Sequence, residues 1–258
     1  MSFSQCEGFI FDLDGVFWLG SKPIPDVGEA VNAIRAQGRR VRFLTNNASQ
    51  HRKEQCAKLN RFGTEADPAE VITAGSATAE TIQKKFGSQK VFVMGTDGLK
   101  EEMEDAGHSV VEDGAECVVV GFDKTFNYEK LQSAFRNIHY HKARFIACNE
   151  NSLYPTESGL SPGNGASVAA LAFAAGKQPE LVVGKPHRSI FDIALEKIDL
   201  PAESCAMVAD LLELDIKGAK ALGMQTIFVL SGIDSEEDIQ KTGITPDHIL
   251  PSAANLKF

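Results

Sequence analysis

Short apolar runs alternate with amphipathic segments along most of the chain. The runs are rich in β-branched and aromatic side chains, as expected of strands buried on both faces of a parallel sheet. The predicted strands lie at 8–11, 41–44, 71–73, 90–94, 117–121, 144–148, 181–183, 205–208, 225–229 and 248–250.

Between these runs, apolar residues recur at helical spacing, and several of the segments end in Gly. Ser49 and Ser76 are the expected N-terminal caps of two helices, because a serine oxygen accepts a hydrogen bond from a free N–H of the first turn. The stretch 149–164 is polar and rich in Pro and Gly, which predicts a long loop of the kind that is usually functional. The predicted helices lie at 27–37, 49–62, 76–87, 97–106, 128–141, 166–175, 189–198 and 215–222.

The alternation of strand and helix indicates an α/β fold, in which helices cover a parallel sheet. With 258 residues, the chain is long enough for one large domain or two smaller ones. Its net charge of −9 disfavours nucleic acid and anionic membranes as partners, since both are negatively charged. An anionic substrate would therefore need a local device, such as a metal ion, a helix N-terminus or a placed lysine.

The five cysteines are widely spaced and odd in number, and no C-x-x-C sequence occurs. They are expected to be reduced core residues of a cytosolic protein. The N-terminus has no basic segment followed by an apolar one, so we expect no signal peptide and a cytoplasmic location. No apolar run reaches the ~20 residues that a membrane span needs.

The most informative stretch is the predicted strand 8–11 and the residues after it. Asp12, Asp14 and Gly15 follow the strand directly. Charge at the end of a buried strand is costly unless it is solvated, paired or bound to a metal, and ligands of open α/β sheets bind at this end. An ordinary turn is the alternative interpretation. A calcium loop is excluded, because the apolar residues 16–19 stand where further oxygen ligands are needed.

Three other motifs fail on their own chemistry. Gly159-x-Ser161-x-Gly163 matches the nucleophile elbow of esterases, but Pro162 has no N–H to serve as oxyanion donor. The pair 184–185 lacks the first glycine and the Ser or Thr of a phosphate-binding P-loop. The glycines at 163 and 165 lack the third glycine of a dinucleotide fingerprint.

Four sets of polar residues remain, and each follows a predicted strand. Because parallel strands end at the same edge of a sheet, we expect all four sets to meet at one edge. Together they would supply acids, a hydroxyl with backbone donors, and a cation. The four sets are Asp12 with Asp14, Thr45 with Asn46, Lys185, and Asp210 with Asp215.

In this order the sets resemble the motifs of the haloacid dehalogenase (HAD) superfamily of phosphohydrolases. These motifs are Asp12-Leu13-Asp14-Gly15-Val16, Thr45-Asn46, Lys185 and Asp210-x-x-x-x-Asp215. Further stretches are similar to subfamily IIA, the NagD-like and p-nitrophenylphosphatase branch, and the resemblance covers nearly the whole chain. These stretches are Phe11-Asp12-Leu13-Asp14-Gly15-Val16-x-x-x-Gly20, Leu44-Thr45-Asn46-Asn47, Tyr154-Pro155-Thr156-Glu157-x-Gly159-Leu160-x-Pro162-Gly163 and Val183-Gly184-Lys185-Pro186.

The resemblance implies a Rossmann-like core, residues 1–75 and 177–258, with an α/β cap domain inserted at 76–176. It implies a magnesium-dependent phosphatase that hydrolyses small phosphomonoesters, such as nucleotide or sugar phosphates, through an aspartyl-phosphate. The expected partner is a small phosphorylated metabolite, and a homodimer is compatible with this class.

The resemblance also implies a role for each candidate residue. Asp12 would attack phosphorus, and Asp14 would protonate the leaving oxygen and then activate water. Lys185 would stabilise the charge of Asp12 and of the transferring group. The residues implied in magnesium binding are Asp12, Asp14 through its backbone carbonyl, Asp210 and, in support, Asp215. The residues implied in phosphate binding are Thr45, Asn46, Asn47 and Lys185.

The chain departs from the family pattern near its last motif. Ala209 stands where the family usually has Gly, and Leu214 stands where it usually has Thr, while Glu213 adds a charge. These changes keep one alternative open, a binding or regulatory protein with weakened catalysis. A second alternative is another reaction on the same fold, that of a phosphomutase or dehalogenase. The sequence does not name the phosphorylated substrate.

Overall fold

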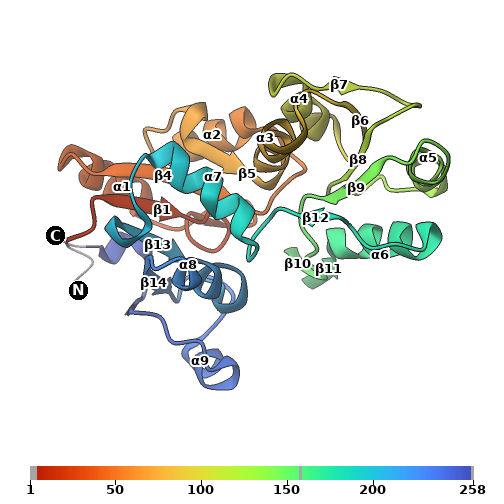
Figure 1. Ribbon diagram of the computed structural model, residues 1–258. Helices are drawn as coiled ribbons and strands as arrows, with labels where there is room; N and C mark the ends of the chain where they lie inside the picture. Colours follow the sequence, from red (N-terminus) through yellow and green to blue (C-terminus); the bar gives the residue numbers. More distant parts are fainter. Residues whose placement is uncertain (1–4, 157–158, 257–258) are drawn as a thin grey trace. The chain divides into compact units, whose positions relative to one another are not determined.

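The computed structural model describes residues 5–156 and 159–256. The chain divides into two compact units, which are described separately (Figure 1). The first unit contains Met1–Thr45, Lys53–Ile72 and Lys185–Phe258, and the second contains Asn46–Arg52 and Thr73–Gly184. The insert predicted at 76–176 lies inside the second unit.

The first unit is built on a parallel sheet that has six strands among the described residues. The strand order is β15-β14-β13-β1-β4-β5. The central strand β1 pairs with β13 on one side and β4 on the other, so the ends of these three strands lie together. The strands are β1 (Gly8–Phe11), β4 (Arg40–Thr45), β5 (Val71–Thr73), β13 (Cys205–Ala209), β14 (Gln225–Val229) and β15 (His248–Leu250).

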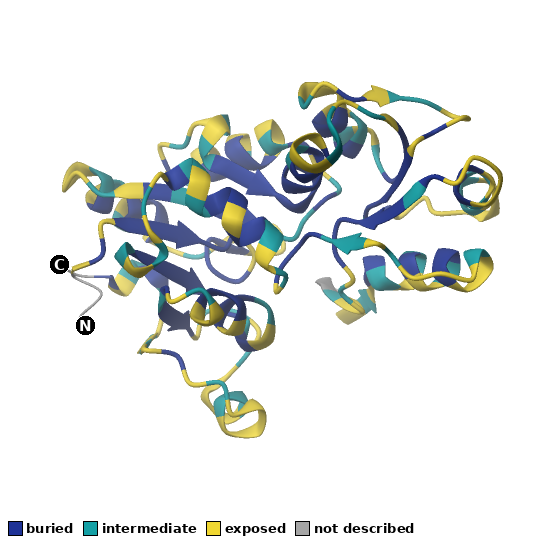
Figure 2. Ribbon diagram, in the orientation of Figure 1, coloured by how far each residue is buried: buried dark blue, intermediate teal, exposed yellow. Residues whose placement is uncertain are grey.

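Aromatic side chains fill much of the core on one side of this sheet. Phe17 packs edge-on against Phe43, with ring centroids 5.6 Å apart, and against Phe11 at 5.9 Å. Figure 2 shows β1 and β13 in the colour of buried residues, which agrees with the apolar runs from which they were predicted. Burial on both faces is typical of a parallel sheet covered by helices. The predicted α/β class is therefore confirmed.

Helices and short turns connect the strands of the first unit. The helices are α1 (Val27–Ala36), α2 (Arg52–Arg61), α7 (Arg188–Ile198), α8 (Lys217–Ala221) and α9 (Glu236–Thr242). The shorter elements are a hairpin of β2 (Trp18–Leu19) and β3 (Lys22–Pro23), the 3₁₀ turns η2 (Pro68–Glu70), η3 (Ala202–Ser204) and η5 (Ala253–Asn255), and the π-helical turn η4 (Leu212–Ile216). The helix predicted at 215–222 is thus a π turn followed by α8. Helix α9 was not predicted, because its sequence is polar on most sides.

Two predicted helix starts are wrong. The helix expected from Ser49 begins at Arg52, because Asn47 Oδ1 accepts hydrogen bonds from Ser49 N and Oγ, both at 2.8 Å, and holds this segment in a turn. The helix expected from Ser76 begins at Ala74. Its cap is Thr73, whose Oγ1 accepts from Ser76 N at 2.9 Å while Ser76 Oγ accepts from Thr73 N at 3.0 Å.

The second unit has its own parallel sheet, of five strands in the order β12-β9-β8-β6-β7 among the described residues. Its core includes Phe92, Val118, Phe145 and Leu171. The strands are β6 (Lys90–Met94), β7 (Ser109–Val110), β8 (Cys117–Val120), β9 (Arg144–Ala147) and β12 (Leu181–Val182). The helices are α3 (Ala74–Phe86), α4 (Asp97–Asp105), α5 (Tyr128–Tyr140) and α6 (Asn164–Ala175).

The stretch predicted as a long loop forms an antiparallel hairpin of β10 (Leu153–Thr156) and β11 (Gly159–Pro162). Two antiparallel strands need only a tight connection, and the Gly and Pro content suggested a loop where the chain actually pairs with itself. Glu157 of the quoted motif lies outside the described residues.

All five cysteines are buried and free, as expected. Among the described residues, no helix combines the length and apolar character required to cross a membrane.

A buried ion pair joins the short segment Asn46–Arg52 to the rest of the second unit. Arg52 Nε donates to Glu102 Oε2 at 2.8 Å, and the backbone N of Arg52 donates to Glu102 Oε1 at 2.7 Å. Glu102, on α4, is fully buried. A buried carboxylate with these donors is well compensated, whereas its removal would leave Arg52 with the more distant carboxylate of Glu80, at 3.6 Å.

We expect Glu102→Ala to lower the free energy of unfolding by about 3–5 kcal/mol, because Arg52 would lose its buried partner. Glu101→Ala, one residue earlier on an exposed position of the same helix, should change it by less than about 0.5 kcal/mol. Urea denaturation followed by circular dichroism measures both. Equal effects of the two substitutions would contradict a stabilising role of the ion pair.

Candidate functional site

A buried lysine joins two carboxylates of the first unit. Lys185 Nζ donates to Asp12 Oδ1 at 2.7 Å and lies 2.6 Å from Asp215 Oδ1. Asp12 and Lys185 are only 4% and 3% exposed, and Asp215 is fully buried. Asp12 follows β1, Lys185 precedes α7, and Asp215 lies in the π turn η4. Residues separated by 173 positions thus form one charged cluster.

The sheet places Asp12 and Asp210 beside each other. Asp12 N donates to Val208 O at 2.9 Å, which extends the pairing of β1 with β13 by one residue. Asp210 then follows Ala209, the last residue of β13. Both carboxylates therefore lie at the carboxyl ends of neighbouring parallel strands, where open α/β sheets bind their ligands.

Lys185 reaches this cluster by another route than predicted. The strand before it, β12, pairs with β9 in the sheet of the second unit, so Lys185 does not follow a strand of the first sheet. The expectation that all four sets of residues end strands of one sheet is therefore wrong. Lys185 stands where the chain returns to the first unit, and its side chain, rather than a shared strand edge, brings it to Asp12.

The ammonium of Lys185 is charged in this environment. Burial by itself lowers the pKa of Lys185, but the carboxylates of Asp12 and Asp215 outweigh this effect and raise the pKa above its usual value. Burial and the charge of Asp12 raise the pKa of Asp215, and this works against an ion pair of Lys185 with a charged Asp215. Because Lys185 contacts two carboxylates at once, its own proton is the more strongly held, and we treat it as the fixed charge of the site.

Asp210 occupies a space that two glycines leave open. A Cβ built on Gly232 would lie 1.9 Å from Asp210 Oδ2, and one built on Gly15 would lie 2.2 Å from the same atom. The Ile233 N–H donates to Asp210 Oδ2 at 2.9 Å. Ser231 Oγ donates to Gly15 O at 2.8 Å and holds the two glycine segments together. Any side chain at either glycine would displace the carboxylate.

The excess of negative charge at this site is not fully compensated. Asp210 Oδ1 and Asp215 Oδ2 are buried and accept no hydrogen bond among the described residues. Burial raises the pKa of Asp210 well above its usual value, and the nearby charges of Asp12 and Asp215 raise it further. Buried oxygen atoms without donors, in an excess of acid over base, are suited to a hard divalent cation.

A cation here would take few side-chain ligands. Among residues 5–156 and 159–256, no group of three or more His, Cys, Asp or Glu side chains stands in a metal-binding arrangement. Mg²⁺ usually binds through one or two carboxylates and keeps several waters. The predicted set of Asp12, Asp210 and the backbone carbonyl of Asp14 fits that pattern.

Asp14 lies in the turn after β1. The indole Nε1 of Trp18 donates to Asp14 Oδ1 at 2.8 Å. Loss of solvent near the carboxyl group raises the pKa of Asp14, and the charge of Asp12 raises it further. The residue as a whole nevertheless remains exposed. A carboxyl group that is both accessible and less acidic than usual is suited to proton transfer.

The predicted phosphate-binding residues are divided between the two units. Thr45 is buried at the end of β4 in the first unit, whereas Asn46 and Asn47 belong to the second. Asn46 Nδ2 donates to Asn151 Oδ1 at 3.1 Å, and its carbonyl oxygen accepts from Asn149 Nδ2 at 2.8 Å. Helix α2 begins six residues after Asn46, at Arg52, so a helix N-terminus does not assist this residue.

The three departures from the family pattern have different surroundings. Ala209 is fully buried in β13. Leu214 lies in the π turn beside Asp215. Glu213, considered as an added charge near the site, instead pairs with Lys217 at 2.6 Å, with both side chains exposed.

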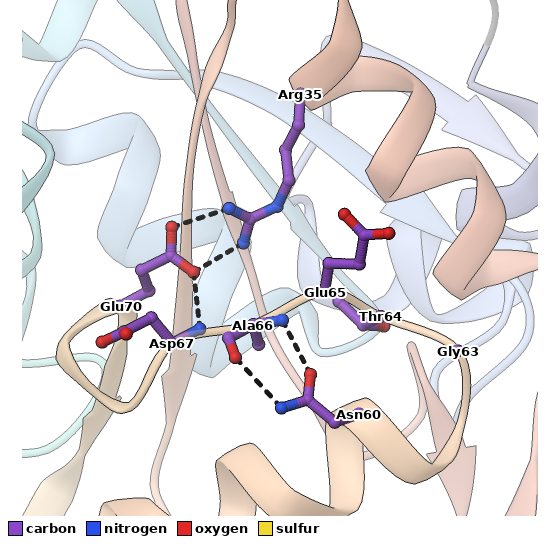
Figure 3. A pocket seen from close by; sticks show the side chains of 8 residues that line it. All are labelled: Arg35, Asn60, Gly63, Thr64, Glu65, Ala66, Asp67 and Glu70. Carbon is purple, nitrogen blue, oxygen red and sulfur yellow. Dashed lines mark hydrogen bonds and ion pairs between the residues drawn. The ribbon is translucent and has the colours of Figure 1, made fainter.

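A surface hollow of the first unit lies among other residues (Figure 3). Arg35 and Glu70 form a two-pronged ion pair there, with both N–O distances at 2.7 Å. Asn60 closes the neighbouring loop by hydrogen bonds to Ala66 N and O. None of the candidate residues lines this hollow, and its polar groups serve to hold η2 and the loop before it.

The sequence analysis missed several residues that shape the site. Gly232 and Ile233 hold Asp210, and Trp18 holds Asp14. Gly232 follows β14, so the rule that ligands bind at strand ends could have found it. Trp18 lies in an apolar run that suggested only core packing.

Two family models match the chain. One, described as haloacid dehalogenase-like hydrolase, matches residues 9–109, and the other, described as HAD-hydrolase-like, matches residues 182–256. Together they include every predicted site residue.

The chain is also similar to characterised proteins over almost its full length. An acid sugar phosphatase of Staphylococcus saprophyticus is 32% identical and is aligned over 94% of this chain and 93% of its own. The solved structure of a p-nitrophenyl phosphatase from Archaeoglobus fulgidus is 34% identical, with a TM-score of 0.92 and coverage of 97% and 98%. A glycerol phosphate phosphatase from Mycobacterium tuberculosis, solved in complex with calcium, is 29% identical, with a TM-score of 0.88 and coverage of 98% and 75%.

We expect Asp210→Asn to stabilise the metal-free protein at pH 7. The pKa of Asp210 is raised by folding, so between its unfolded and folded pKa values the native state binds more protons, and stability falls as pH rises. Removing the charge should add on the order of 1 kcal/mol to the free energy of unfolding at pH 7. The wild type should become more stable when the pH is lowered to about 5, and Asp210→Asn should gain less from the same change. Urea unfolding in the presence of a chelator measures this effect.

Asp192→Asn is the matched control, since Asp192 lies on the exposed side of α7 beside Arg188. It should change the free energy of unfolding by less than about 0.5 kcal/mol. A loss of stability in Asp210→Asn at pH 7 would show that its carboxylate is compensated in the native state.

Proposed function

The chain belongs to the haloacid dehalogenase superfamily, in its NagD-like subfamily IIA, and is a phosphatase; from this we propose that it hydrolyses small phosphomonoesters with the help of Mg²⁺ and through a phosphorylated Asp12. The observation that carries the proposal is the buried cluster of Asp12, Lys185 and Asp215 beside Asp210. It combines the proposed nucleophile, a fixed cation and oxygen atoms that accept no hydrogen bond from the described part of the chain.

Asp12 is the proposed nucleophile. One of its oxygens, Oδ1, is bound by Lys185, which leaves Oδ2 to attack phosphorus in line with the departing oxygen. The bond from Asp12 to phosphorus forms as the bond to the leaving oxygen breaks. Lys185 then stabilises the negative charge that passes from the carboxylate to the phosphoryl oxygens.

Asp14 is the proposed proton donor. It follows the same strand and is an exposed residue. In the first step Asp14 gives its proton to the leaving oxygen, and in the second it takes a proton from the water that attacks the phosphorylated Asp12. The free carboxylate of Asp12 is thereby restored and phosphate is released.

Mg²⁺, when bound, would neutralise phosphoryl charge and let an anionic nucleophile approach an anionic substrate. The residues proposed to hold it are Asp12, Asp210 and the backbone carbonyl of Asp14. Asp215 supports this arrangement by holding Lys185. The unpartnered oxygen of Asp210 supports the choice of this residue as a ligand.

Thr45 is proposed to bind phosphoryl oxygens through its hydroxyl, together with Asn46 and Asn47. The second unit is proposed to act as a cap that excludes water and contacts the rest of the substrate. A sugar phosphate is the substrate class that the similarity to the acid sugar phosphatase favours, and the similarity to the glycerol phosphate phosphatase favours small polyol phosphates as well. A panel of phosphorylated metabolites, assayed by released phosphate, tests the substrate class and separates hydrolysis from isomerisation.

We expect Asp12→Asn to abolish magnesium-dependent hydrolysis of p-nitrophenyl phosphate, because an amide does not form the phosphorylated intermediate. A chelator should abolish wild-type turnover, and added Mg²⁺ should restore it. Release of p-nitrophenol measures both effects. Turnover by folded Asp12→Asn would exclude Asp12 as the nucleophile.

We expect Lys185→Ala to reduce kcat/KM by about 10²–10³-fold, the usual effect of removing a donor that stabilises developing charge. Lys217→Ala, which removes an exposed lysine of α8, should leave kcat/KM within about twofold of the wild type. A change of less than about threefold in Lys185→Ala would contradict the proposed role.

A further inference from the structure

A chain of contacts leads from Asp14 to a residue with no role in the mechanism above. Trp18 Nε1 donates to Asp14 Oδ1 at 2.8 Å, and Lys58 Nζ lies 3.8 Å from the centre of the Trp18 ring. Lys58 Nζ also donates to Gly20 O at 3.1 Å. All four residues belong to the first unit, and Lys58 comes from α2.

The indole is held rigidly. Trp18 is only 1% exposed and packs against Phe17 and Phe62, with ring centroids 6.2 Å and 5.9 Å away. Its backbone is held as well, because Gly15 N donates to Trp18 O at 2.8 Å and closes the turn that carries Asp14. A side chain fixed by the core on one side thus holds an exposed carboxyl group on the other.

The direction of this hydrogen bond assigns different tasks to the two oxygens of Asp14. An indole N–H only donates, so Oδ1 acts as an acceptor and the proton of a neutral Asp14 is carried on Oδ2. The Lys58 ammonium over the ring draws electron density from the indole and strengthens its N–H as a donor. The same bond stabilises the carboxylate that remains after the proton is transferred.

We propose that Trp18, supported by Lys58, is a positioning residue for Asp14 and determines how well esters with poor leaving groups are cleaved. This inference rests on the proposed function. Asp14 Oδ2 gives its proton to the ester oxygen as the bond from that oxygen to phosphorus breaks and its electron pair stays on the oxygen. An alkoxide needs this proton, whereas p-nitrophenolate leaves without it.

The test compares two substrates in Trp18→Phe, which keeps an aromatic ring but removes the N–H. The quantity to measure is kcat/KM, because release of phosphate from Asp12 follows loss of the leaving group and does not enter it. We expect kcat/KM for glycerol phosphate to fall about tenfold or more, in keeping with the loss of a hydrogen bond to a charged group. For p-nitrophenyl phosphate the fall should be less than about twofold.

Two further variants separate positioning from general damage to the fold. Phe62→Leu loosens the packing of the indole but leaves its N–H, so it should lower kcat/KM for glycerol phosphate less than Trp18→Phe does. Lys58→Met removes the charge near the ring and near Asp14, together with the hydrogen bond to Gly20 O, and keeps most of the side-chain volume. It should lower kcat/KM for glycerol phosphate about two- to fivefold more than kcat/KM for p-nitrophenyl phosphate. Lys58→Met carries the test by itself if Trp18→Phe does not fold.

The outcomes distinguish this inference from the proposed function. If the wild type hydrolyses both esters and Trp18→Phe lowers both kcat/KM values equally, Trp18 has only a structural role and the inference fails alone. If Asp14→Asn lowers kcat/KM for the two esters equally, Asp14 is not the proton donor. This result overturns both the inference and the proposed role of Asp14. A selective loss for glycerol phosphate in Trp18→Phe and Asp14→Asn, with a smaller one in Phe62→Leu, supports both.

Discussion

One buried ammonium holds the site together. Lys185 contacts both Asp12 and Asp215, and all three side chains are withdrawn from water. Carboxylates crowded in a poorly solvated space repel each other, and a shared cation offsets part of that repulsion. The end of β1, the π turn and the segment before α7 therefore meet at a single charge.

The same cluster carries more negative than positive charge, and this excess links stability to function. Asp210 adds a third acid, with one oxygen that accepts no hydrogen bond among the described residues. Two glycines leave room for this carboxylate where any side chain would collide with it. A fold optimised for stability would remove such a residue, so its presence is typical of a site that is completed by a ligand.

The two acids of the opening motif are held in different ways. Asp12 is held by the hydrogen bonds of a central strand and by a buried lysine, whereas Asp14 is exposed and is held through Trp18, whose ring is fixed in the aromatic core. The role proposed for Asp12, a nucleophile, gains from being held in one place, whereas the role proposed for Asp14, a proton donor, also requires access to the substrate. Two carboxylates two positions apart thus receive different environments from the same turn.

The sequence by itself determined the α/β class, most of the strands and helices, and the family, because these depend on local periodicity and on short motifs that stay intact along the chain. It also indicated which acids belong to the site. Only the tertiary structure decided how they meet. The strand before Lys185 joins the second sheet, Asn47 turns the chain where a helix was expected, and Gly232, Ile233 and Trp18 complete the site from positions with no chemical signal of their own. Contacts between residues far apart in the chain depend on strand order and packing, which a local pattern does not encode.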